Sequence, residues 1–249
     1  MRAVCIGLGL GLLLSGCAAT FKETVTPARP GTPTELPWRL NPELLTPANE
    51  RIEFVVEQLA GHAPNRQALN DLVELASRYG GRPASWVMHR QGEPFTLEPN
   101  VSYVIVRYVG HQLPSFGLAY SREVQGRVLY FLIINQEVHR NFKLLMPIRR
   151  LEQQTLIHEY GHLLGLPVPH YGYYPKYPDF SGGMHCVSPD CPLSRPRPKA
   201  VLYNAFWIAF GHHYLVDYCA DCQEAIAQAQ ALWKAHPEKA RRSSVKPKK

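Results

Sequence analysis

Three residues in one short stretch, His158, Glu159 and His162, have the types and spacing of a metal-dependent hydrolytic site. On an α-helix, residues four apart lie on the same face, so the two imidazoles can bind one metal ion. Glu159 lies beside them, where its carboxylate can reach a metal-bound water as general base. Zinc suits this task because it lowers the pKa of such a water and polarises a peptide carbonyl. The stretch therefore predicts a zinc peptidase site whose third protein ligand comes from elsewhere in the chain.

A helix is predicted around this motif, from about Ile148 to Gly165. Leu151, Thr155 and His162 recur at helical spacing. Gly165 lies where a helix commonly ends in a left-handed residue. The motif is therefore expected near the C-terminal end of a helix.

The other predicted elements are helices and strands in mixed order. Helical spacing predicts further helices at about residues 52–61, 68–80, 200–215 and 222–235. Runs of β-branched and aromatic residues predict strands at 101–109, 116–124 and 128–138. The last two strands could form a hairpin around Gly126. This order predicts an α/β (α+β) domain with a helical C-terminal subdomain.

The first residues have the features of a bacterial export signal. A positive start is followed by an apolar run, residues 3–14, which is too short to span a bilayer. The run ends in Leu14-Ser15-Gly16-Cys17, which resembles the lipobox of bacterial lipoproteins. The resemblance implies cleavage after residue 16 and lipidation of Cys17, whose acyl chains would anchor the domain in a membrane. We expect a cell-envelope location, and Ala18 favours the outer membrane of a Gram-negative cell.

One domain is predicted between two extended segments. Residues 1–16 form the signal peptide, 17–47 a lipidated Pro-rich tether, 48–235 the peptidase domain and 236–249 a basic disordered tail. The net charge of +7 is mostly local, because residues 234–249 contribute +6. Such a tail could bind nucleic acid, but the export signal argues against it, so we expect no nucleic-acid partner. The oligomeric state is left open.

From Thr155 to Gly165 the chain resembles the metzincin family of zinc peptidases, whose helix motif is H-E-x-x-H-x-x-G-x-x-H. The resemblance implies a small twisted mixed sheet packed on helices, an active-site helix, and a peptide or protein substrate. It also implies a sharp turn at the glycine that brings a third histidine to the metal. The chain departs from the family at this point, because position 168 is Val. The third ligand must come later, and the candidates in falling order are His185, His170 and Asp179.

The cysteines resemble those of the archaemetzincins, in which H-C-x4-C-x-M and a later C-x-x-C follow the helix. The corresponding residues here are His185, Cys186, Cys191, Cys219 and Cys222. The resemblance implies His185 as the third zinc ligand, displaced by an inserted stretch. It also implies a second, structural zinc on the four cysteines. Outside the cytoplasm the same cysteines could instead form two disulfides, and both alternatives remain open.

The preferred hypothesis is a metzincin-like, lipid-anchored zinc peptidase. His158, His162 and His185 would hold the metal, and Glu159 would take a proton from the activated water and pass it to the leaving amine. The strand at 128–138 is expected to be the edge that aligns an extended peptide. The family Met beneath the zinc is Leu193 here, a nearly isosteric change.

Two other hypotheses remain. A non-catalytic lipoprotein could use the same scaffold to bind zinc or a partner at the envelope. An enzyme that hydrolyses peptidoglycan cross-links would share the metal chemistry and differ only in its substrate.

Overall fold

The structure, a computed structural model, describes residues 40–58, 63–90, 92–93, 95–110, 116–141, 148–166, 185–186, 188, 191–193 and 217–238. The described elements are α2 (Pro42–Leu45), β1 (Arg51–Gln58), α3 (Arg66–Gly80), β2 (Ala84–Arg90), β3 (Val101–Val109), β4 (Gly117–Val124), β5 (Arg127–Asn135), α4 (Gln136–Asn141), α5 (Ile148–Leu163) and α7 (Ala220–Ala235). Within these ranges, no helix combines the length and the apolar character needed to cross a membrane.

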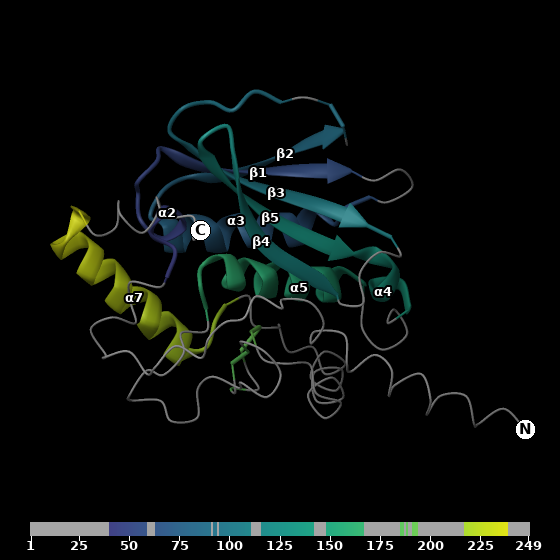
Figure 1. Ribbon diagram of the computed structural model, residues 1–249. Coiled ribbons are helices and arrows are strands. Elements are labelled where there is room, and N and C mark those ends of the chain that lie inside the picture. The colour runs from purple at the N-terminus through teal and green to yellow at the C-terminus, as the bar shows by residue number, and fades with distance from the viewer. Residues whose placement is uncertain are drawn as a thin grey trace, which may run out of the picture.

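The strands form one mixed sheet in the order β2-β1-β3-β5-β4. β1 pairs in parallel with β2 and with β3, and β3 pairs in parallel with β5, whereas β4 runs antiparallel to β5. Helices α3 and α5 lie along one face of the sheet, and α7 lies at one end of them (Figure 1). The predicted α/β class is therefore confirmed.

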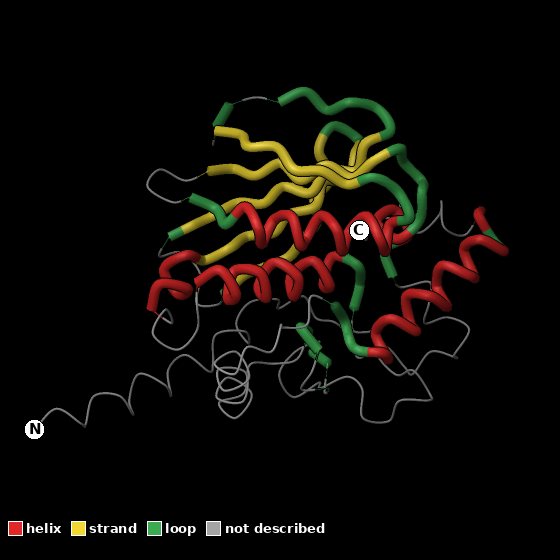
Figure 2. Tube along the Cα trace, turned by 180° about the vertical axis from the view of Figure 1, so that it is seen from behind, coloured by secondary structure: helices red, strands yellow, loops and turns green. Residues whose placement is uncertain are grey.

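Apolar side chains cover both faces of the central strands. The main core, on the helix side, includes Phe54, Val104, Leu72, Leu156 and Trp233. On the opposite face, Tyr103 and Ile105 of β3 pack with Phe95 and Leu97 from the connection between β2 and β3. Figure 2 shows this connection over the face of the sheet that lies away from the helices. The helix-side core holds α5 against β4 and β5.

The helix predicted at about residues 52–61 is wrong, because this segment forms strand β1. Ile52, Phe54 and Val56 face the main core, and Val55 faces the second cluster. A parallel strand that is buried on both faces has an almost continuous apolar run, and helical spacing also fits such a run. Strand β2 was not predicted, because its exposed and half-buried residues do not alternate regularly.

The helix predicted at 68–80 and the three predicted strands are present as α3, β3, β4 and β5. The hairpin between β4 and β5 turns at Gln125 and Gly126, whose φ values of 53° and 72° fit a two-residue turn with positive φ. The third strand ends at Asn135 rather than at 138, because helix α4 begins at Gln136.

The core begins before residue 48, the expected start of the domain. Leu44 is fully buried, and Asn41 binds the end of α5. The backbone N–H of Asn41 donates to the carbonyl of Leu164 at 2.9 Å, and its side-chain amide donates to the carbonyl of Leu163 at 3.1 Å. Asn41, which lies within the expected tether, thus supplies two donors to the last carbonyls of the motif helix.

Several predictions concern residues outside the described ranges. They are the signal peptide with Cys17, the tether up to residue 39, the helix at 200–215 and most of the basic tail. The last predicted helix corresponds to α7, which begins at Ala220. Its Gln230 donates to the carbonyls of Leu45 and Tyr79 at 2.9 and 2.6 Å, so α7 is joined to α2 and α3.

Candidate metal centre and active site

The C-terminal turn of α5 positions the imidazole of His162. Gly165 has a φ of 87°, and its N–H donates to the carbonyl of His162 at 3.0 Å. The N–H of Leu166 donates to the carbonyl of Gly161 at 2.9 Å, which completes a Schellman motif. This turn brings the carbonyl of Leu166 back to within 3.1 Å of Nδ1 of His162. Gly165 therefore shapes the site even though the family's histidine is missing from position 168.

The structure brings together His158, His162 and His185. Their ligand atoms lie within 4.8 Å of one another, and the Nε2 atoms of His158 and His162 are 3.1 Å apart. The ring centroid of His185 lies 5.2 Å from that of His158 and 5.5 Å from that of His162. His185 is buried, and the two helix histidines are half-buried. The alternative ligands His170 and Asp179 lie outside the described residues.

Backbone carbonyls orient the two helix imidazoles. Nδ1 of His158 lies 2.8 Å from the carbonyl oxygen of Pro192, just as Nδ1 of His162 contacts that of Leu166. A carbonyl oxygen only accepts, so each Nδ1 carries the proton and each Nε2 keeps a lone pair. The two lone pairs converge on the same space. Metal-ligating histidines have this type of outer partner, so the two helix imidazoles, with His185 beside them, fit a zinc ion.

Burial keeps the helix imidazoles neutral, which is the form that binds metals. It lowers the pKa of His162 to about 4. It also lowers the pKa of His158 well below its usual value, and the like charges of His162 and His185 add to this effect. The carboxyl of Glu159 responds in the opposite direction, because burial raises its pKa to about 8. A cation held by the three histidines would lower the pKa of Glu159 again, because it favours the ionised carboxylate.

Strand β4 contacts, at Gly117, the face of α5 that carries Glu159. A Cβ atom added to Gly117 would lie 2.7 Å from Cγ and 2.8 Å from Oε1 of Glu159, and 2.9 Å from Cγ2 of Thr155. Real Cβ atoms do not approach other atoms this closely. The missing side chain of Gly117 thus provides the space that the Glu159 side chain occupies.

The edge strand beside the site is β4, so the prediction that residues 128–138 form the edge is wrong. β5 pairs with β3 on one side and with β4 on the other. Because β5 follows the direction of β3, the preceding arm of the hairpin is displaced outward and becomes the last strand in the order. Strand periodicity alone does not reveal which arm of a hairpin faces outward.

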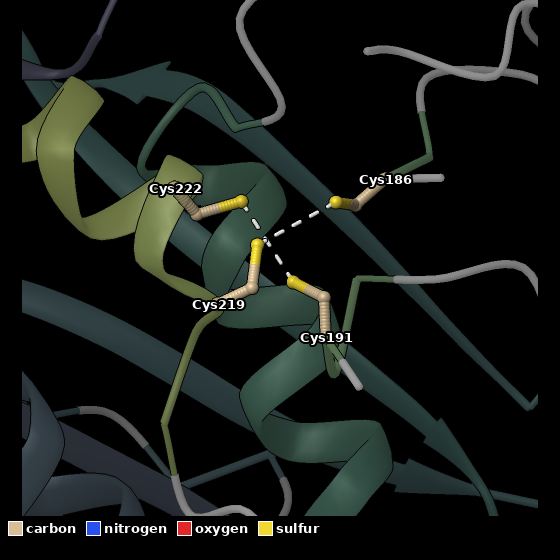
Figure 3. Close-up of side chains that lie close together, drawn as sticks. All are labelled: Cys186, Cys191, Cys219 and Cys222. Carbon is tan, nitrogen blue, oxygen red and sulfur yellow. Dashed lines mark hydrogen bonds between the residues drawn. The ribbon is translucent and has the colours of Figure 1, made fainter. Parts of the chain in front are cut away.

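Four cysteines form a second cluster on the side of α5 away from the sheet. Their sulfur atoms point toward one another, two from the start of α7 and two from residues 186–191 (Figure 3). The Sγ atoms of Cys186 and Cys219 are 3.7 Å apart, as are those of Cys191 and Cys222. A tetrahedron with metal–sulfur bonds of about 2.3 Å has edges of about 3.8 Å. A disulfide needs about 2.05 Å, so this arrangement fits a metal ion better than two disulfides.

The segment before Cys219 is fixed to both α3 and α5. Asp217 forms an ion pair with Arg78 at 2.8 Å and accepts a hydrogen bond from the hydroxyl of Tyr79. The hydroxyl of Tyr218 donates to the carbonyl of Ile157 at 3.0 Å. The start of α7 is thereby held next to the helical turn that carries His158.

Leu193, at the position expected for the family Met, packs against α5. It is fully buried, and a Cβ atom added to Gly161 would lie 2.7 Å from its Cδ2 atom. The carbonyl of Leu193 accepts a hydrogen bond from the N–H of Cys186 at 2.9 Å. Leu193 therefore contacts the motif helix and also supports the chain next to His185.

Comparisons with known proteins give one structural similarity. No family model and no curated protein matches the chain. The crystal structure of archaemetzincin from Methanopyrus kandleri is similar with 15% sequence identity and a TM-score of 0.42, over 73% of this chain and 96% of that chain. A similarity of this size does not identify a function.

The metal-free protein is expected to lose stability between pH 6.5 and 8 because of Glu159. The folded-state pKa is about 8 and the ordinary value is 4.5, so in this interval the folded state binds more protons than the unfolded state. Stability then falls as pH rises, by at most about 1.4 kcal/mol per pH unit. His162 acts in the opposite direction, but only between pH 4 and 6.5.

Urea unfolding of the chelated protein at several pH values measures this effect. Glu159→Gln removes the titrating carboxyl and serves as the reference. The difference in unfolding free energy between the two proteins should change with pH above 6.5, and parallel curves would contradict the assigned environment of Glu159.

Proposed function

We propose that this protein is a zinc-dependent peptidase in which His158, His162 and His185 hold the metal and Glu159 is the general base. The observation that carries the proposal is the convergence of three imidazoles beside a buried glutamate at a sheet edge. Three nitrogen ligands leave one position of a tetrahedral zinc open, which is the arrangement of a catalytic rather than a structural site.

The side chains of the site support hydrolysis. A zinc ion held there would supply a Lewis acid that polarises a carbonyl and lowers the pKa of a nearby water. Glu159 would take a proton from the attacking water and deliver it to the leaving amine. Burial makes Glu159 a stronger base than an exposed glutamate, and a zinc ion held by the histidines would keep it ionised near neutral pH. Its carboxyl can therefore both accept and return a proton.

The neighbouring strand supports a peptide as substrate. An extended peptide can add to an exposed sheet edge through backbone hydrogen bonds. Among the described strands, β4 lies at the edge on this side, and Gly117 at its start touches Glu159. A peptide paired with the start of β4 would thus run past the general base.

We assign a second zinc to Cys186, Cys191, Cys219 and Cys222, on the strength of the 3.7 Å sulfur separations. We also propose attachment to the cell envelope through lipidated Cys17, for which the support is the lipobox-like sequence alone. Radiolabelled palmitate should enter the wild-type chain and not the Cys17→Ala variant. Equal labelling of both would contradict the anchor.

Metal analysis combined with digestion of a broad peptide library tests the proposed function. The purified protein should contain two zinc ions per chain, one for each cluster, and should cleave peptides until a chelator removes the metal. Zinc binding without cleavage of any peptide would favour the non-catalytic binder. Cleavage restricted to peptidoglycan fragments would retain the chemistry and change the substrate.

A further inference from the structure

One turn of the chain, residues 191–193, contacts both the cysteine cluster and the group of three histidines. The sulfur of Cys191 faces the other cysteines, and the carbonyl of the next residue, Pro192, accepts the Nδ1 proton of His158 at 2.8 Å. Leu193 then packs against Gly161 on α5. The position of the carbonyl that orients His158 therefore depends on where Cys191 is held.

The third histidine is attached to the same cluster. His185 precedes Cys186, and both residues are buried, at 5% and 2% exposure. The N–H of Cys186 donates to the carbonyl of Leu193, which joins the segment that carries Cys186 to the turn at residues 191–193. The sulfur of Cys186 lies 3.7 Å from that of Cys219. The place of His185 beside the helix thus depends on a contact between Cys186 and the start of α7.

The remaining histidine is held differently. His162 is oriented by Leu166, whose turn belongs to α5 itself. Of the three imidazoles, two are therefore positioned through cysteine-bearing segments and one through the helix alone. Without a metal, the thiols are joined only by weak sulfur hydrogen bonds, which constrain the turn much less than four metal–thiolate bonds.

We infer that the cysteine cluster controls the metal affinity of the histidine site, so that filling the first raises the affinity of the second. The inference rests on the proposed function, because it assumes that the three histidines bind a metal. Cys191 and Pro192 act as positioning residues for His158, and Cys186 acts as one for His185. Losing an outer partner of a metal-bound histidine typically lowers metal affinity by about 10–100-fold. By thermodynamic linkage, filling the histidine site must raise the metal affinity of the cysteine site by the same factor.

Titration of the reduced, metal-free full chain with Co²⁺ tests the inference without measuring hydrolysis. The thiolate charge-transfer absorption reports the cysteine site, and the weaker visible absorption reports the nitrogen-ligated site. Cys222→Ser removes a sulfur from α7 and leaves the residues next to His185 and Pro192 unchanged. Ala229→Ser, which places a hydroxyl at another buried position of the same helix, is the matched control.

The affinity of the histidine site for Co²⁺ should fall about 10–100-fold in Cys222→Ser and remain at the wild-type value in Ala229→Ser. An unchanged affinity after loss of the thiolate absorption would overturn the coupling and leave the proposed function intact. A wild-type chain whose histidine site takes up no Co²⁺ would instead contradict the proposed function.

The reciprocal measurement requires no cysteine variant. In His162→Gln, the cysteine site should bind Co²⁺ more weakly than in the wild type with its histidine site filled, and by the same factor. Equal affinities in the two proteins would also overturn the coupling.

Discussion

Glu159→Gln is expected to reduce peptide hydrolysis by at least about 10²–10⁴-fold, the usual contribution of a general acid–base group. The amide has the shape of the carboxyl but cannot take a proton from water. The three histidines keep their positions, so zinc content should be unchanged. The relevant measurements are kcat on a peptide selected from the library and zinc per chain.

Glu152→Gln is the matched control for this substitution. Glu152 is a second buried glutamate on α5, and its Oε1 atom accepts hydrogen bonds from the hydroxyl of Tyr108 at 2.6 Å and the N–H of Asn65 at 2.9 Å. The amide oxygen of glutamine can accept the same two bonds, so the variant should remain active. Undiminished hydrolysis by Glu159→Gln would remove Glu159 from the mechanism.

Gly117→Ala is expected to lower kcat by about 100-fold, because displacing a catalytic group by about 1 Å has an effect of that size. The added methyl group would overlap Cγ of Glu159 and Cγ2 of Thr155. Either the glutamate changes rotamer or β4 moves away from α5. The histidines are not touched, so the zinc content should be retained while kcat falls.

Gly110→Ala provides the control, since an added Cβ atom there has no neighbour within 4 Å. It should have wild-type kinetics. If Gly117→Ala raised KM and left kcat unchanged, β4 would contribute to substrate binding without positioning Glu159. Equal kinetics of the two variants would contradict the close contact between β4 and the general base.

Part of the fold could be predicted from local patterns. Helix α5 has residues at helical spacing and is followed by Gly165 with its positive φ, and the β4–β5 hairpin has a glycine turn between two β-rich runs. Strand β1 was misassigned because both of its faces are buried, which makes its apolar run compatible with a helix. Strand β2 has Val87 and Met88 exposed at 42% and 41%, so its pattern gives little indication of an inner face.

The candidate site also has residues that could be predicted from the sequence and contacts that could not. The spacing of His158, Glu159 and His162 follows from helix geometry and is visible in the sequence. The proximity of His185 could be expected only through the resemblance of its neighbouring cysteines to a known pattern. The hydrogen bond between His158 and the carbonyl of Pro192 could not be predicted. Every residue has a carbonyl, and only the tertiary structure decides which one lies next to His158.

The contact between Gly117 and α5 was not predicted either, although the sequence contains an indication of it. A glycine at the start of a β-rich run often marks a place where another part of the chain approaches closely. The sequence does not identify the approaching group. Here it is Glu159, more than forty residues later in the chain.

Among the described strands, β4 lies at the edge of the sheet, and this position has a consequence for solubility. An unpaired strand edge is a template for any extended chain, including the same edge of a second copy. The far half of β4 has exposed Ser121, Arg122 and Glu123, and charged side chains on an edge disfavour pairing between copies. The part near Gly117 lacks such charges. The charged side chains that disfavour pairing between copies thus lie along one half of this edge strand, away from Glu159.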